Sequence, residues 1–100
     1  MKREIKKLSY ELVSLLEELL REDSCIDIAN EYYYVLENYT RQLKEALDRN
    51  LWYSIIMKIF YISEITFLLQ QRTRTCTILN DIRSLISEIQ TKIALRIFKY

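Results

Sequence analysis

Apolar residues recur along the chain at alternating spacings of three and four, which is the pattern of an amphipathic helix with one buried face. Short polar stretches separate four such blocks, which predict helices over residues 3–21, 26–48, 51–70 and 76–98. The apolar stripe of the first block is Ile5, Leu8, Leu12, Leu15 and Leu19. The pattern predicts one all-α domain over residues 1–100, with a four-helix, bundle-like fold.

The third block differs from the others because it is apolar nearly all round. A helix of that kind lies at the centre of a bundle or crosses a membrane, and the block is close to the ~20 residues that a span needs. Lys58 and Glu64 lie well inside it, and each costs about 2.5–3.5 kcal/mol at the middle of a bilayer. The other three helices also need an apolar surface to pack on. We therefore expect a central apolar third helix, with a membrane span as the alternative.

Polar residues predict where the second helix begins and ends. Ser24 followed by Asp27 is a variant of the capping box that satisfies the first backbone N–H groups of a helix. Asn50 is the predicted end, because Asn tolerates the left-handed conformation that closes many helices.

The chain contains no Gly and no Pro, whereas soluble proteins average roughly 7% and 5%. Hairpin turns, strand bulges and phosphate-binding loops need residues that tolerate positive φ, and here Asn and Asp would have to supply them. The composition therefore argues against a β-rich domain and against a P-loop.

No catalytic, cofactor or metal site is expected. The chain has no histidine, which removes the commonest general base and metal ligand. Its two cysteines, Cys25 and Cys76, fit neither a disulfide framework nor a zinc site, and we expect both to be small buried hydrophobes. Glu17 and Glu18, and the acidic pair that follows them, are expected to belong to a solvated helix face. We expect that the protein is not an enzyme and binds no small-molecule ligand.

The formal net charge of +1 predicts no general attraction to nucleic acid or membrane lipid. The basic N-terminal residues are followed by an amphipathic segment rather than by the unbroken apolar stretch of a secretory signal. We expect an intracellular protein, nuclear if the source is eukaryotic and cytoplasmic otherwise.

Tyrosines and arginines are the candidate binding residues. The spacing of Tyr32 and Tyr39 predicts that they face the core, with Tyr33 and Tyr34 at its fringe, although a tyrosine cluster also suits a protein interface. Arginines 72, 74 and 83 suit an acidic partner or a solvated helix start equally well. The predicted partner interface consists of Tyr32, Tyr33, Tyr34, Tyr39, Trp52, Arg72, Arg74 and Arg83.

The segment from Leu68 to Leu79 resembles the arginine-rich segment, roughly R-N-x-R-C, of the first "partner of Sld-five" subunit of the GINS replication complex. Arg72 matches the first arginine of that segment and Cys76 its cysteine. Thr73 replaces the usual Asn, and Thr75 replaces the second Arg. The order of the four predicted helices also agrees with that family.

The resemblance implies a non-catalytic scaffold subunit that acts through helix packing. GINS subunits pack side by side into a four-part assembly, which joins the MCM helicase and the Cdc-forty-five protein in DNA replication. The expected partners are then GINS-like subunits and the replicative helicase, with direct nucleic-acid contact unexpected. Known members also carry a small β-rich domain after the helices.

The alternative hypothesis is a small self-associating helical protein of a virus or mobile element, such as a regulator. An Ile- and Tyr-rich chain of this size suits that class as well. A homodimer would distinguish it from a subunit that requires other proteins.

Overall fold

The computed structural model describes residues 2–21, 30–72 and 76–98. They form four helices, α1 (Lys2–Arg21), α3 (Asn30–Asp48), α4 (Trp52–Arg72) and α5 (Thr77–Phe98), and no strand occurs among them. The all-α, bundle-like fold is therefore confirmed, and most helix bounds agree with the predicted ones within two residues. Residues 26–29 of the second predicted helix, and with them the proposed Ser24 cap, lie outside the described ranges.

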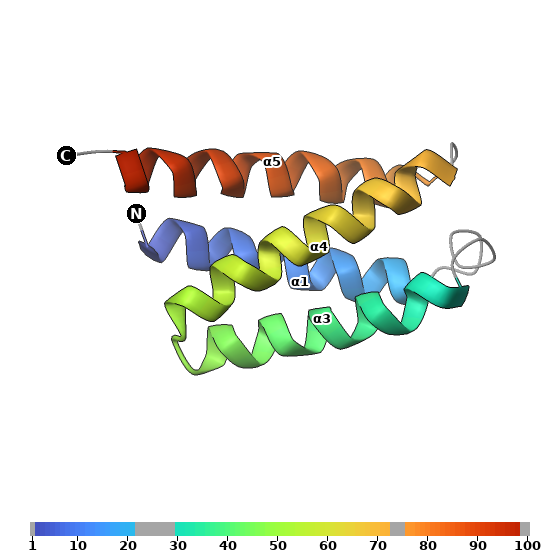
Figure 1. Cartoon of the computed structure of the whole chain (residues 1–100), viewed down its shortest axis with the longest axis horizontal. Coiled ribbons are helices and arrows are strands. Elements are labelled where there is room, and N and C mark those ends of the chain that lie inside the picture. Colours follow the sequence, from blue (N-terminus) through green and yellow to red (C-terminus); the bar gives the residue numbers. More distant parts are fainter. Residues whose placement is uncertain (1, 22–29, 73–75, 99–100) are drawn as a thin grey trace.

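The helices alternate in direction along an elongated body of 44 × 24 × 17 Å (Figure 1). Each packs mainly against two others: α3 lies between α1 and α4, and α5 closes the ring by packing against α4 and α1. Figure 1 shows one end of the bundle formed by the beginnings of α1 and α4 and the ends of α3 and α5. Segments far apart in sequence therefore meet at that end.

The core is a continuous aliphatic cluster to which all four helices contribute, and its fully buried members are mostly Leu and Ile. Three buried hydroxyls lie among them, on Ser9, Thr40 and Thr66. Each donates a hydrogen bond to the carbonyl oxygen four residues earlier in its own helix, over 2.7–2.9 Å. These hydroxyls are therefore satisfied within their own helices.

The α3–α4 turn ends α3 as the sequence predicts. Asn50 has a φ of 57°, in the left-handed region. The N–H of Leu51 donates to the carbonyl of Ala46 over 2.9 Å, and the N–H of Asn50 donates to that of Leu47 over 3.2 Å. These two bonds form a Schellman motif, which satisfies carbonyl groups left over at the end of the helix.

The expectation of a central third helix is wrong. In the described part of the chain α4 occupies one corner of a ring of four helices, and it buries only the side that faces α3 and α5. A ring of four helices has no additional central position, so a helix that is apolar all round must leave one face outside.

Cys76 is buried as expected, with 5% of its surface exposed, but its sulfur is disulfide-bonded. The expectation that Cys76 is buried is therefore confirmed, and the expectation that it takes no part in a disulfide is wrong. Cys25 lies outside the described ranges.

Candidate functional site

The side of α4 that points away from the bundle carries large apolar side chains. We call it the α4 outer face, and it consists of Tyr53, Met57, Phe60, Glu64, Phe67 and Leu68. Tyr53 is 76% exposed, and Phe60 and Phe67 are 47% and 48% exposed. These positions follow their own three–four spacing, so α4 carries a second apolar stripe opposite the buried one. Glu64 is the one charge within the set.

The outward faces of the other helices are more polar than that of α4. Their exposed large apolar residues are Tyr10 on α1, Tyr34 and Val35 on α3, and Leu95 and Ile97 on α5. On α5 the outward positions include Ser84, Ser87 and Glu88, and α1 and α3 expose mainly Lys, Arg and Glu. Single exposed apolar residues are normal on a soluble protein, but a contiguous apolar patch marks a contact surface. This patch was not among the predicted sites, although the sequence shows a second set of positions at three–four spacing, 53, 57, 60, 64 and 67.

An aromatic cluster joins α3 to α4 at the edge of this face. The rings of Tyr39 and Tyr61 lie 5.4 Å apart between centroids, and the ammonium of Lys58 lies 5.8 and 5.3 Å from them. Both distances are within the range of a cation–π interaction. This arrangement places the charge of Lys58 on aromatic rings rather than within the apolar stripe.

The tyrosine run on α3 divides as the spacing predicts. Tyr32 and Tyr39 pack against the core, while Tyr34 is 72% exposed. Tyr33 contacts Tyr34 edge-on, with centroids 5.4 Å apart, and lines a shallow cleft between α1 and α3. Tyr33 and Tyr34 point away from α4, so the predicted interface residues do not form one surface.

Arg83 is used within the bundle. Its Nη1 donates to the carbonyl oxygen of Ser63 over 2.7 Å, and it lies 3.2 Å from the hydroxyls of Ser63 and Thr66. Its guanidinium also lies 5.6 Å from the centroid of the Phe67 ring. Arg83 therefore holds α5 against α4. The side chain of Arg72, and Arg74 as a whole, lie outside what the structure describes.

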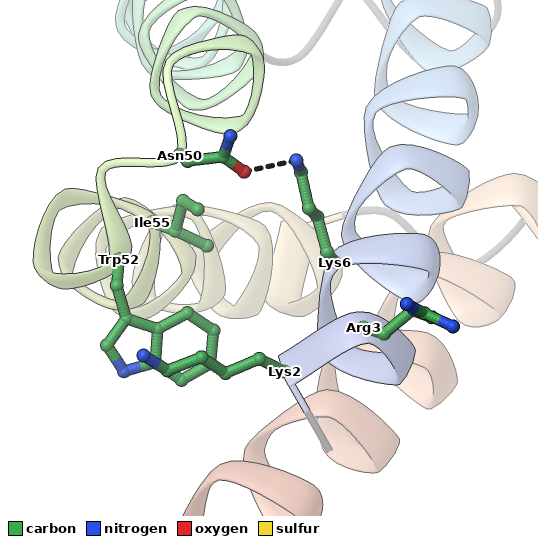
Figure 2. A pocket seen from close by; sticks show the side chains of 6 residues that line it. All are labelled: Lys2, Arg3, Lys6, Asn50, Trp52 and Ile55. Carbon is green, nitrogen blue, oxygen red and sulfur yellow. Dashed lines mark hydrogen bonds between the residues drawn. The ribbon is translucent and has the colours of Figure 1, made fainter.

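Trp52 stands at the opposite end of α4, in a pocket of about 370 Å³ between the beginnings of α1 and α4 (Figure 2). The ammonium of Lys2 and the guanidinium of Arg96 lie 5.2 and 5.4 Å from its indole ring. Lys6 donates a hydrogen bond to the side-chain oxygen of Asn50 across the pocket (Figure 2). The lining residues are Lys2, Arg3, Lys6, Asn50, Trp52 and Ile55.

Carboxylates near this pocket are engaged with other groups. Glu4 pairs with Lys92 over 3.2 Å, and Asp48 accepts a 2.7 Å hydrogen bond from the hydroxyl of Tyr10. That hydrogen bond raises the pKa of Tyr10, with smaller contributions from desolvation and from the charge of Asp48. The end of the bundle is therefore locally basic, which the net charge of +1 does not show.

One described helix, Trp52–Gln71, is long and apolar enough to cross a membrane, and 28% of its most apolar window is buried. Membrane spans and helices packed in soluble bundles share this length and composition. Among the residues with described positions, no group of three or more Cys, Asp or Glu is arranged to hold a metal ion. Comparisons with family models, with curated proteins and with solved structures give no match to this chain.

Proposed function

We propose that this chain is a non-catalytic helical interaction module that binds a partner protein through the α4 outer face. The observation that carries the proposal is the apolar stripe along the length of α4, which is longer than the pairs of exposed apolar residues on α3 and α5. Aromatic residues are enriched where interfaces are energetically strongest. A helix that carries such a stripe can accept the apolar face of a second helix.

The size of the stripe suits the centre of an interface. Burying the exposed parts of Tyr53, Phe60 and Phe67 would remove on the order of 350 Å² of surface from water. A standard interface buries about 800 Å² per partner, so the stripe would supply roughly half of it. The cost of association and of ordering side chains offsets much of the gain, which makes aromatic anchors the main source of affinity.

A more specific proposal is a scaffold subunit of a replication complex of the GINS type. It rests on the resemblance of the segment around Arg72 and Cys76 and on the order of the helices. GINS-like subunits and the replicative helicase would then be the partners, and the protein would be intracellular.

Self-association is the second candidate, and the symmetry of the stripe favours it. In an antiparallel pair of α4 helices centred on Ile62, four of the six outer-face positions meet one another. Met57 meets Phe67 and Phe60 meets Glu64, whereas Tyr53 and Leu68 meet residues outside the set. A two-fold dimer requires a self-complementary surface of this kind. This candidate corresponds to the small viral or mobile-element protein.

Affinity capture of the tagged chain from lysate of its native source, read by mass spectrometry, separates the candidates. Recovery of GINS-like subunits or a helicase at fixed stoichiometry would support the replication proposal. Recovery of the bait alone, together with a dimer by light scattering, would contradict it and leave self-association. A chain that is monomeric and captures nothing would contradict the interaction module itself. Capture only in the detergent-extracted fraction would instead point to a membrane role for α4.

A further inference from the structure

The pocket around Trp52 combines positive charge with an aromatic wall, and its ligand chemistry can be read from that combination. Three of its lining residues carry positive charge, Lys2, Arg3 and Lys6, and none carries negative charge. Arg96 adds a fourth positive group from the end of α5, because its guanidinium lies over the indole. Such a concentration of cations favours an anion with more than one charge.

Helix dipoles do not supply this preference. α1 and α4 begin at this end of the bundle, whereas α3 and α5 end there (Figure 1). Their partial charges are of opposite sign and largely cancel. The side chains therefore decide the local potential, and they come from the beginning of α1 and the end of α5.

Trp52 organises the cations. Lys2 and Arg96 both lie within cation–π distance of its ring, which holds two long side chains from different helices beside each other. Lys6 is held in turn by its hydrogen bond to the side chain of Asn50, in the α3–α4 turn. Ordering the donors before a ligand arrives lowers the entropic cost of binding.

The apolar part of the pocket suits a ring. Ile55 and the indole of Trp52 form one wall, and Lys6 reaches across the pocket from α1 (Figure 2). The side chain of Lys2 lies along the indole, and that of Arg3 points away from Trp52 (Figure 2). The volume of about 370 Å³ lies within the range of small-molecule sites and exceeds what an isolated phosphate fills. The geometry points to a phosphate ester of mononucleotide size, with its phosphate on Lys2 and Lys6 and its ring against the apolar wall of Ile55 and Trp52.

This inference is independent of the proposed function, because the pocket lies at the end of the bundle and the α4 outer face along its side. It also departs from the expectation that the chain binds no small-molecule ligand. The pocket ligand is either a free nucleotide or the phosphorylated end of a nucleic-acid strand, and the two share the same chemistry.

Tryptophan fluorescence gives a direct test, because Trp52 is the chain's one tryptophan. The probes are adenosine monophosphate, inorganic phosphate, adenosine and a short 5′-phosphorylated oligonucleotide, added at constant ionic strength. We expect a saturable change with adenosine monophosphate, binding about tenfold weaker with inorganic phosphate, and none with adenosine. Tighter binding of the oligonucleotide than of the mononucleotide would identify a strand end as the source, and the reverse order would identify a free nucleotide.

A charge-matched pair of variants completes the test. The double variant Lys2→Gln, Lys6→Gln should weaken binding of adenosine monophosphate by at least about tenfold, since it removes two charged contacts. The control, Arg41→Gln, Lys44→Gln on α3, removes equal charge away from the pocket and should leave binding unchanged. Calorimetry supplies a second readout for both. No saturable signal with any phosphate probe, or equal weakening in the control, would overturn the inference.

Discussion

At the scale of single residues, the α3–α4 turn depends on one backbone conformation. Asn50 has a φ of 57°, where a side chain with a β-carbon costs about 1–2 kcal/mol unless it is Asn or Asp. We predict that Asn50→Ala lowers the free energy of unfolding by about 1 kcal/mol relative to Asn50→Gly, because Gly has no β-carbon. Both variants lose the contact to Lys6, so chemical denaturation of the two isolates the backbone effect. Equal stability would show that the left-handed conformation is not required.

The hydrogen bond between Tyr10 and Asp48 predicts a dependence of stability on alkaline pH. Its formation raises the pKa of Tyr10 in the folded state above the ordinary value of 10.0. The stabilisation is therefore fully present below that value and is lost as pH rises through the higher folded pKa. Tyr10→Phe lacks the hydroxyl, so its free energy of unfolding should not show this loss. The difference in free energy of unfolding between the unsubstituted protein and Tyr10→Phe should therefore narrow at alkaline pH. A constant difference at every pH would contradict the assignment.

Arg83 contacts α4 inside the bundle, so its replacement should lower the stability of the fold. Replacing it with Gln removes its charged hydrogen bonds to Ser63 and Thr66, which we expect to lower the free energy of unfolding by about 1–2 kcal/mol. Arg41→Gln is the matched control: it removes an exposed hydrogen bond to Asn38 on the same helix turn, so it should change stability far less. Urea denaturation measures both. An unchanged urea midpoint for Arg83→Gln would mean that these hydrogen bonds add nothing to the stability of the fold.

At the scale of helices, neighbouring residues of α4 separate its two faces. Ile59 is fully buried and Phe60 is 47% exposed. We predict that Ile59→Ala lowers the free energy of unfolding by about 2–5 kcal/mol, because it leaves a cavity in the core. Phe60→Ala should change it by less than about 0.5 kcal/mol, as for most surface positions. A comparable loss at both positions would show that the outer face is packed within the isolated protein.

Helix patterns explain what the sequence could predict. The three–four stripe beginning at Ile5 predicts a buried face correctly, because polar residues cover the opposite side of that helix. On α4 the pattern does not discriminate, since both Ile59 and Phe60 belong to apolar stripes. The prediction of a central helix failed for this reason. The prediction that the second helix ends at Asn50 was correct, because Asn is one of the few residue types that favour the left-handed conformation.

At the scale of the whole molecule, topology brings together charges that are remote in sequence. Lys2 and Arg96 meet at Trp52 only because α1 begins where α5 ends (Figure 1). Neither the net charge nor the local sequence indicates that these two residues lie close together, so the pocket could not be predicted without the fold. Arg83 likewise could not be assigned to a contact with Ser63 before the packing of α5 on α4 was known.

The central claim is that the α4 outer face binds a protein. The most direct measurement compares partner capture and self-association for two double variants with equal added charge. Phe60→Glu, Phe67→Glu places carboxylates on the outer face, and Ser84→Glu, Ser87→Glu places them on the outward side of α5. We predict that the first variant stays folded by circular dichroism but loses the partner or the dimer, and that the second keeps it. Retained binding in the first variant, or equal loss in both, would contradict the claim.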